Sequence, residues 1–252
     1  MLHVLPKHTE IVLTIQPTTT APIIQLMITR TANSESCWKL ANEWLSQCKA
    51  AHDRCCVTLT ERSLSTRLIF VGSTNLEIRL CLSNQLPPGV EYPTLSHCWG
   101  KLRFKTLTTQ PLPSMLVSID ASILAKPFQG AIDAMIRLGH KYIWIGSLCI
   151  LQDSEEGWQY ESQRMSQVYC KSSLNLAASA ATDSNTENSP IPACGVTVAH
   201  DPPSKQRSTW SCMPDHWAIT LLNTNPLGKR GWVVQEQCWA PRALHFGSSQ
   251  IV

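Results

Sequence analysis

A nearly unbroken run of apolar residues occupies positions 142–150, with the sequence YIWIGSLCI. A run of this length suits a β-strand that is buried on both faces, as in a parallel sheet with helices on either side. Polar residues follow at once, and Asp153 and Glu156 have the spacing of a capping box. The pattern therefore predicts a central strand that passes directly into a helix.

The predicted helix carries an acidic residue on its apolar face. Trp158, Met165, Val168 and Tyr169 fall on one stripe at helical spacing, and Glu161 lies on that same stripe. Open α/β sheets place ligand chemistry just past the carboxyl ends of their central strands. Glu161 is therefore a candidate functional residue.

Alternating and helical patterns in the rest of the chain predict further elements. In chain order, these are a strand at 11–15 or 23–28, a helix at 36–52, hairpin strands at 68–71 and 76–82, a short strand within 92–100, a helix at 128–138 that ends at Gly139, strands at 174–178 and 217–222, a helix at 230–239, and strands at 243–246 and 250–252. The stretches 101–127 and 180–203 have the composition of surface loops. The strand within 92–100, the helix at 128–138 and the strand at 142–150 form a βαβ unit, whose crossover requires parallel strands.

This order of elements predicts an α/β fold of three layers, in which helices flank a mostly parallel central sheet. Pro87, Pro88 and Gly89 interrupt the chain and place a domain boundary near residue 90. The predicted parts are an irregular segment at 1–35, an extension of one helix and one β-hairpin at 36–89, and the main domain at 90–252. The last apolar run stops without a turn or cap, which predicts that the domain is truncated at its C-terminus.

Composition and charge exclude several classes of protein. The chain has 252 residues and is 43% hydrophobic, which is enough for a sizeable core. Its net charge of +3 is too small and too dispersed to indicate a nucleic-acid partner. No apolar run approaches the ~18 residues of a membrane span. The 11 cysteines are odd in number and follow no signal peptide, so we expect a cytoplasmic protein with reduced thiols.

Three cysteines and one histidine lie close together at the end of the helix at 36–52 and just beyond it. Cys48, His52, Cys55 and Cys56 have spacings at which two thiolates and an imidazole can bind zinc. The alternative is that they are plain buried thiols, since Cys48 falls on the apolar stripe and no second CxxC pair follows. The sequence favours the plain thiols, and we predict no metal.

The segment YPTLSHCWG ends in residues that invite an assignment as a nucleophile. Adjacent residues of a strand point to opposite sides, so His97 and Cys98 are poorly placed to act on each other. No GxSxG motif surrounds any serine. Protease and esterase chemistry is therefore disfavoured. Ser96 and Trp99 lie at the carboxyl end of a strand, where they can line a nucleotide pocket, although Trp99 can equally close the core.

Five motifs in this order resemble the heterokaryon incompatibility (HET) domain of filamentous fungi: YPTLSHCWG, the DAM at 133–135, LGHKYIWIGSLCILQD, GWQYESQRMSQVY and RGWVVQEQCWAPRALHF. The upstream segment with Trp44, Cys48, His52 and Cys55, followed by TRLIFVG, resembles the segment that commonly precedes that domain. The resemblance covers about residues 37–252. Gly146 departs from the pattern, because the family usually has Asp there.

The resemblance implies a role in non-self recognition between fused hyphae that ends in regulated cell death. In such proteins this domain is usually the death-inducing effector. It implies action through self-association or protein partners, with no required cofactor. An inactive relic of such a domain is a further alternative.

HET domains are in turn distantly similar to Toll/interleukin-receptor (TIR) domains, which implies a TIR/flavodoxin-like fold. Some TIR domains cleave NAD⁺ at the nicotinamide bond with a glutamate on the helix after a central strand. The pair Trp158 and Glu161 resembles that glutamate's setting. The similarity implies Glu161 as the catalytic residue, Ser96, Trp99, Asp153 and Trp158 as ligand-binding residues, and NAD⁺ as a substrate. Whether the chain is an enzyme stays open.

Polar residues of these motifs also have structural interpretations. Glu161 can bond neighbouring backbone or an arginine such as Arg137 or Arg230. Asp133 lies beside the apolar stripe of its helix, where it can pair with a basic residue. A larger group is expected to form one polar network that anchors the last helix, namely Arg230, Gln235, Glu236 and Arg242.

Overall fold

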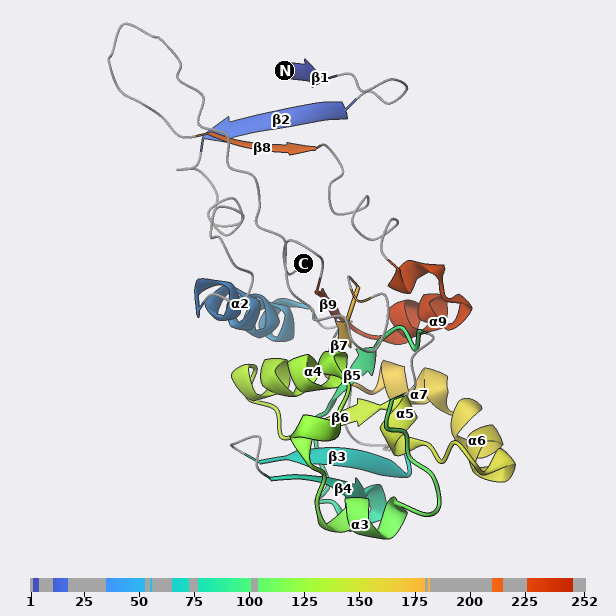
Figure 1. Cartoon of the computed structure of the whole chain (residues 1–252). Helices are drawn as coiled ribbons and strands as arrows, with labels where there is room; N and C mark the ends of the chain where they lie inside the picture. The colour runs from blue at the N-terminus through green and yellow to red at the C-terminus, as the bar shows by residue number, and fades with distance from the viewer. Residues whose placement is uncertain are drawn as a thin grey trace, which may run out of the picture.

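The computed structural model describes residues 2–4, 11–17, 35–52, 55, 65–72, 77–100, 104–179, 181, 210–214 and 226–246. Its centre is a six-stranded sheet with the strand order β4-β3-β6-β5-β7-β9 (Figure 1). The strands are β3 (Arg67–Val71), β4 (Ile78–Leu82), β5 (Pro93–Ser96), β6 (Tyr142–Ile145), β7 (Leu174–Ala177) and β9 (Ala243–His245).

The sheet is mostly parallel, as predicted, with antiparallel pairing at the β3 and β4 edge. β5 pairs in parallel with β6 and with β7, and β7 pairs in parallel with β9. β3 pairs antiparallel with both β6 and β4. The predicted βαβ crossover is confirmed as β5, α4 (Lys126–Arg137) and β6. The predicted hairpin is confirmed as β3 and β4, and it belongs to this same sheet, so the boundary expected near residue 90 falls between strands of one sheet.

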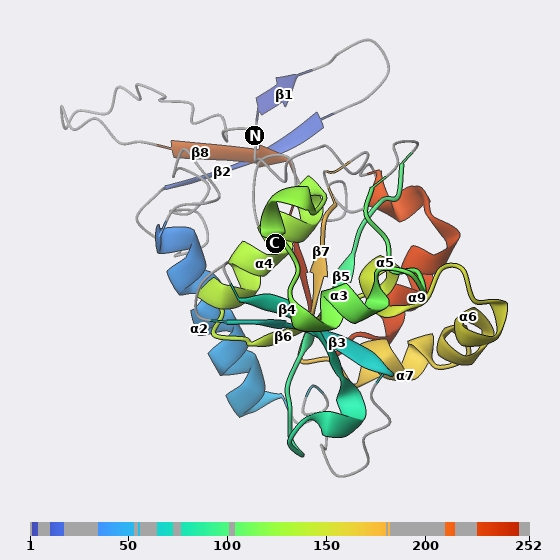
Figure 2. The ribbon, with the colours of Figure 1, turned by 60° about the horizontal axis from the view of Figure 1, so that its bottom comes forward.

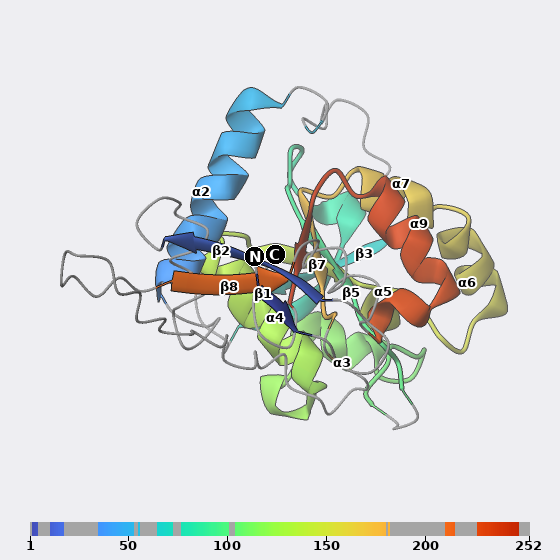
Figure 3. The ribbon, with the colours of Figure 1, turned by 90° about the horizontal axis from the view of Figure 1, so that it is seen from above.

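Helices lie on both faces of the sheet and form three layers with it. α2 (Glu35–Ala51) and α4 lie on one face, as Figure 2 shows. Figure 3 shows the helices of the other face, α5 (Gly146–Cys149), α6 (Glu155–Ser162), α7 (Met165–Cys170) and α9 (Gly231–Trp239). α3 (Leu112–Val117) packs against β4, and short 3-10 turns form η2 (Ser83–Gln85), η3 (Ala121–Ile123) and η4 (Leu227–Lys229). Within the described ranges, no helix is long and apolar enough to cross a bilayer.

A second, smaller sheet contains strands from distant parts of the sequence. β1 (Leu2–Val4), β2 (Ile11–Pro17) and β8 (Trp210–Pro214) form antiparallel pairs, with β2 in the middle. The strand predicted at 11–15 is confirmed by β2. The strands predicted at 23–28, 217–222 and 250–252 lie outside the described residues, as does the loop at 180–203 apart from Ala181.

The hydrophobic core fills the space between the sheet and its helices. All four residues of β7 are buried, and Ile143, Trp144 and Ile145 of β6 are at most 1% exposed. The connection at 101–127, predicted to be a surface loop, also contributes to the core. It contains α3 and η3, and its buried apolar residues include Leu107, Met115, Ile119, Leu124 and Ala125. This segment is therefore folded against the core instead of forming a surface loop, because the burial of apolar side chains away from water lowers the free energy.

The apolar run at 142–150 is not one strand. β6 ends at Ile145, and the next four residues form the short helix α5, in which Leu148 and Cys149 are fully buried. The prediction of a nine-residue strand is therefore wrong. Burial on all sides removes the alternation that distinguishes a strand from a buried helical turn, so the pattern alone could not separate them.

The helix after this run has a different cap from the one predicted. Ser154 is the N-cap of α6, and its Oγ accepts a hydrogen bond from the Gly157 amide at 3.1 Å. The carboxyl oxygens of Asp153 instead accept hydrogen bonds from the Thr109 amide at 3.0 and 2.9 Å. Asp and Ser are both good caps. In the folded chain Asp153 bonds to Thr109 in another segment, so Ser154 is the N-cap residue of α6 instead.

The single helix predicted around Trp158 and Tyr169 is in fact two helices. α6 and α7 are separated by a turn at Gln163 and Arg164. The turn breaks the apolar stripe, so Trp158 is 46% exposed whereas Glu161 and Tyr169 are 2% exposed.

Gly139 ends α4 in the conformation that glycine favours, as the sequence predicted. Its φ is 75°, its amide donates to the carbonyl of Ile136 at 3.0 Å, and the His140 amide donates to Met135 at 2.8 Å. This pairing is a Schellman motif. Nothing lies within 4 Å of a Cβ built at this position, so only the backbone conformation opposes a side chain.

We therefore expect Gly139→Ala to lower the free energy of unfolding by about 1 kcal/mol, the cost of a left-handed residue with a Cβ. Urea denaturation measures this change. Gly231→Ala is the matched control, because Gly231 also has open space around it but has no positive φ. Equal stability of the two variants would contradict the conclusion that the left-handed conformation of Gly139 opposes a side chain there.

Candidate functional site

A cavity of about 250 Å³ lies beyond the carboxyl ends of the parallel strands β5 and β6. This is the edge at which open α/β sheets bind ligands. The walls come from β5, β6, α5, α6, α7 and α9 and from the residues that follow β5. The lining residues are Leu95, His97, Trp99, Trp144, Gly146, Ser147, Ile150, Gln152, Trp158, Met165, Tyr169, Arg230, Trp232 and Glu236. We call this space the tryptophan cavity.

Four tryptophans from four separate segments give the cavity its aromatic walls. Trp144 belongs to β6 and is 1% exposed, so it forms part of the buried end. Trp99, Trp158 and Trp232 are 40%, 46% and 50% exposed, so they line the side that is open to solvent. Aromatic faces of this kind stack on planar rings and attract cations.

His97 lies at the inner wall as a neutral imidazole. Burial, together with the positive charge of Arg230, lowers its pKa from 6.5 to about 3. The ring packs edge-on against Phe128, with centroids 4.8 Å apart, and stacks parallel to Trp99 at 6.3 Å. A neutral imidazole can donate or accept one hydrogen bond at each nitrogen according to its tautomer.

Arg230 and Glu236 form the charged part of the wall. The Arg230 guanidinium donates a hydrogen bond to the His97 carbonyl, and its Nη2 lies 3.9 Å from Oε1 of Glu236. Burial raises the pKa of Glu236, and this effect exceeds the opposing effects of the Ser96 hydroxyl, Arg230 and the Tyr169 hydroxyl. Glu236 is therefore a carboxyl group that can change charge when a ligand binds beside it.

Three buried polar atoms of the lining residues have no hydrogen-bond partner among the described residues. They are Nε2 of His97, Oγ of Ser147 and Oε2 of Glu236. An unsatisfied buried polar group costs about 1–3 kcal/mol, so such groups in a native structure generally serve a bound molecule or ordered water. Their presence in one aromatic cavity is the property expected of a small-molecule site.

Glu161 is buried, but it is not among the residues that line the cavity. Its Oε1 accepts hydrogen bonds from the Thr66 amide at 3.0 Å and from the Thr66 hydroxyl. Its Oε2 accepts from Ser65 Oγ at 3.1 Å, and Ser65 in turn accepts from the indole N–H of Trp144 at 2.8 Å. The backbone alternative therefore holds for one of these hydrogen bonds, whereas the Ser65 and Thr66 hydroxyls donate the other two, and neither Arg137 nor Arg230 is among these donors.

The other predicted ligand-binding residues divide into two groups. Trp99 and Trp158 line the cavity. Ser96 is buried behind it and donates to Oδ1 of Asn175 at 3.1 Å, and Asp153 is held by Thr109. Asp133 is exposed on α4.

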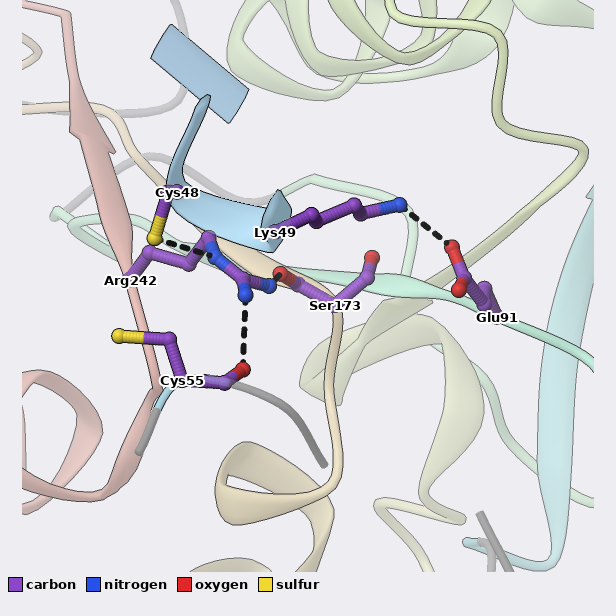
Figure 4. A network of polar contacts seen from close by, with 6 residues as sticks. All are labelled: Cys48, Lys49, Cys55, Glu91, Ser173 and Arg242. Atoms are coloured by element: carbon purple, nitrogen blue, oxygen red, sulfur yellow. Dashed lines mark hydrogen bonds and ion pairs between the residues drawn. The ribbon is translucent and has the colours of Figure 1, made fainter. Parts of the chain in front are cut away.

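The polar network expected at the last helix is split between two places. Arg230 and Glu236 meet in the cavity, whereas Arg242 lies beside Cys48, Cys55 and Ser173 (Figure 4). The pKa of Cys48 is lowered to about 7, mainly because Arg242 donates a hydrogen bond to its sulfur. One network of Arg230, Gln235, Glu236 and Arg242 is therefore not formed.

Sequence reasoning missed several lining residues. His97 was considered only as a partner of Cys98, and Glu236 only as a structural residue. Trp144, Ser147 and Trp232 were not considered as ligand residues. The one available signal was the density of tryptophan within the motifs, since indoles in four separate motifs suggest a shared aromatic site.

Comparisons with known proteins identify the family. The family model described as heterokaryon incompatibility protein (HET) matches residues 92–236, which is more than half of the chain. A search of curated proteins and a search of solved structures each found no match. The matched range contains all the residues that line the tryptophan cavity. On the strength of this match, the chain belongs to the heterokaryon incompatibility (HET) family.

Proposed function

We propose that this chain is a cytoplasmic cell-death effector of fungal non-self recognition, and that it acts by cleaving NAD⁺ in the tryptophan cavity. Membership of the HET family supports the biological role. The observation that supports NAD⁺ cleavage is the cavity itself, which is lined by four tryptophans and by three polar atoms that have no hydrogen-bond partner within the described part of the chain.

The shape of the cavity favours one end of the dinucleotide. Sites for drug-sized ligands enclose about 300–1,000 Å³. A space of about 250 Å³ is below that range, so it suits the nicotinamide ring and its ribose, with the rest of the molecule outside. The nicotinamide ring of NAD⁺ is planar and cationic, and indole faces bind such a group by stacking and by cation–π attraction.

Cleavage breaks the bond between ribose C1′ and nicotinamide N1. The electron pair of that bond leaves with N1, a water oxygen adds to C1′, and one proton is released, giving ADP-ribose and nicotinamide. Positive charge develops on the sugar as the bond breaks, and an ionised carboxyl group stabilises it. We assign this role to Glu236, whose Oε2 accepts no hydrogen bond from any described residue, and we propose a positioning role for Glu161 through Ser65 and Trp144.

Purified chain incubated with NAD⁺ should release nicotinamide, measured by chromatography. Glu236→Gln should lower the rate by about 10²-fold, because glutamine keeps the shape but cannot carry the charge. The wild-type rate should also fall as the pH drops through the raised pKa of Glu236, since only the ionised form stabilises the sugar cation. That dependence should be absent in Glu236→Gln.

Glu156→Gln is the matched control, since Glu156 is exposed on α6 and does not line the cavity. Its rate should equal that of the wild type. An unchanged rate in Glu236→Gln would contradict the assignment of Glu236. If no nicotinamide is released even at high protein concentration, the enzymatic proposal is wrong.

Self-association is the second candidate mechanism, and exposed aromatic residues outside the cavity favour it. Tyr160 on α6 and Trp239 on α9 are 53% and 49% exposed and do not line the cavity. Contiguous exposed apolar patches mark contact surfaces, and the self-association proposal requires each of these side chains to belong to such a patch. Light scattering over a range of concentrations, with wild type and Trp239→Ser, tests this mechanism. If NAD⁺ cleavage, self-association and killing of hyphae on expression are all absent, the chain is an inactive relic.

A further inference from the structure

The cluster at the end of α2 uses residues that the proposed function does not involve. Cys48, His52 and Cys55 each offer one metal-binding atom, and all three atoms lie within 4.8 Å of one another. The cluster lies outside both the tryptophan cavity and the range 92–236 matched by the family model.

The local backbone brings the three side chains to one side. The His52 amide donates to the Cys48 carbonyl at 3.1 Å, and the Cys55 amide donates to the His52 carbonyl at 3.0 Å. The first of these bonds extends the helical hydrogen-bond pattern to His52, one residue beyond the end of α2, and residues four apart on a helix lie on the same face. The second bond holds Cys55 next to His52.

Arg242 holds two of these residues from the sheet side (Figure 4). Its Nε donates to Sγ of Cys48 at 3.3 Å, and its Nη2 donates to the Cys55 carbonyl at 2.7 Å. Its Nη1 donates to the Ser173 carbonyl at 2.7 Å. Metal sites characteristically have an outer shell of this kind, which orients the ligands through hydrogen bonds.

The charges of the cluster suit a divalent cation in spite of this arginine. Two thiolates and a neutral imidazole carry a total charge of −2, so a bound divalent ion leaves the centre neutral. The Arg242 guanidinium then lies beside a neutral centre. Its hydrogen bond to Sγ of Cys48 stabilises the thiolate. Thiolate and imidazole donors select zinc over the oxygen-seeking magnesium and calcium ions.

In place of the plain thiols that the sequence favours, we propose that Cys48, His52 and Cys55 bind one zinc ion, with water in the fourth tetrahedral position. His52 is exposed and the two cysteines are half-buried, so the ion can enter from solvent. Through Arg242, which lies immediately before β9, and Ser173, which lies immediately before β7, the bound ion would fix the end of α2 to the sheet.

Measurement of the zinc bound by the full chain tests the proposal directly. Elemental analysis of wild-type protein dialysed against zinc and then against metal-free buffer should give one zinc per chain. Replacement of zinc by cobalt should produce thiolate-to-cobalt charge-transfer absorption and the intense visible bands of a tetrahedral site. Because these measurements use the wild type, they do not depend on whether a variant folds.

Variants identify the ligands. Cys48→Ser and Cys55→Ser should each lose the zinc, whereas Cys170→Ser, which changes an exposed cysteine on α7, should keep it. Arg242→Lys should bind zinc about 10–100-fold more weakly, as expected when an outer-shell partner is lost.

Three results would overturn the proposal. One is wild-type protein that takes up no zinc under reducing conditions, another is equal zinc content in Cys48→Ser and Cys170→Ser, and the third is a zinc-loaded protein whose cobalt form lacks thiolate charge-transfer absorption. NAD⁺ cleavage is measured separately and uses other residues, so failure of either proposal leaves the other unaffected.

Discussion

Glu161→Ala should lower the free energy of unfolding by about 3 kcal/mol. The carboxyl group is 2% exposed and accepts hydrogen bonds from Ser65 Oγ, the Thr66 amide and the Thr66 hydroxyl. Each such bond contributes about 1 kcal/mol, and the buried Ser65 hydroxyl would be left without this acceptor. Because Ser65 also accepts from the Trp144 indole, the loss should extend to the wall of the cavity.

Urea denaturation measures this loss, with Glu156→Ala as the control on the same helix. Glu156 is exposed, so its replacement should change the stability by less than about 1 kcal/mol. A Glu161→Ala protein as stable as the wild type would argue against a structural role for this carboxyl group. If such a protein also failed to cleave NAD⁺, the result would support the positioning role proposed for Glu161 without a role in stability.

Acidification should destabilise the protein through His97. The pKa of this imidazole falls from 6.5 to about 3 on folding, so between these values the unfolded chain binds a proton that the folded protein does not. Stability is therefore complete above the unfolded pKa and decreases as the pH falls toward 3. At about 1.4 kcal/mol for each pH unit, the loss is about 2 kcal/mol near pH 5.

Denaturation curves between about pH 7.5 and pH 5 measure the effect. His97→Leu removes the titrating group and should show a much shallower dependence over this range, although it loses stability at every pH from altered packing on Phe128. Burial also lowers the pKa values of His140 and His245, which contributes a residual slope of the same sign, whereas the raised pKa of Glu236 contributes one of the opposite sign. If the stability of wild type and of His97→Leu changed equally with pH, His97 would not be the source of the acid destabilisation.

Much of the fold followed from local patterns. The helix α2, the hairpin β3–β4 and the crossover β5–α4–β6 all appear in the sequence as clear periodicities. These predictions succeeded because amphipathic elements with one buried face record that burial in their spacing. The end of α4 was predictable for a different reason, since the left-handed φ of Gly139 has a strong residue preference.

Other features could not be read from spacing. The run at 142–150 is buried on all sides and lacks an alternation that would show where β6 ends and α5 begins. Glu161 was correctly placed on an inward face, but the direction of its carboxyl group depends on Ser65 and Thr66, which are about a hundred residues earlier. Glu236 and His97 are far apart in sequence and meet only through the sheet and Arg230.

The sequence by itself determined the family, the α/β class and the main secondary structure, because motifs and periodicities are local properties of the chain. The tertiary structure alone decided which polar groups face the tryptophan cavity and which form hydrogen bonds within the core. The physical reason is that a side chain's partners are set by packing between distant segments. Two glutamates of similar chemistry thus have different surroundings, with Glu161 bonded within the core and Glu236 facing the cavity.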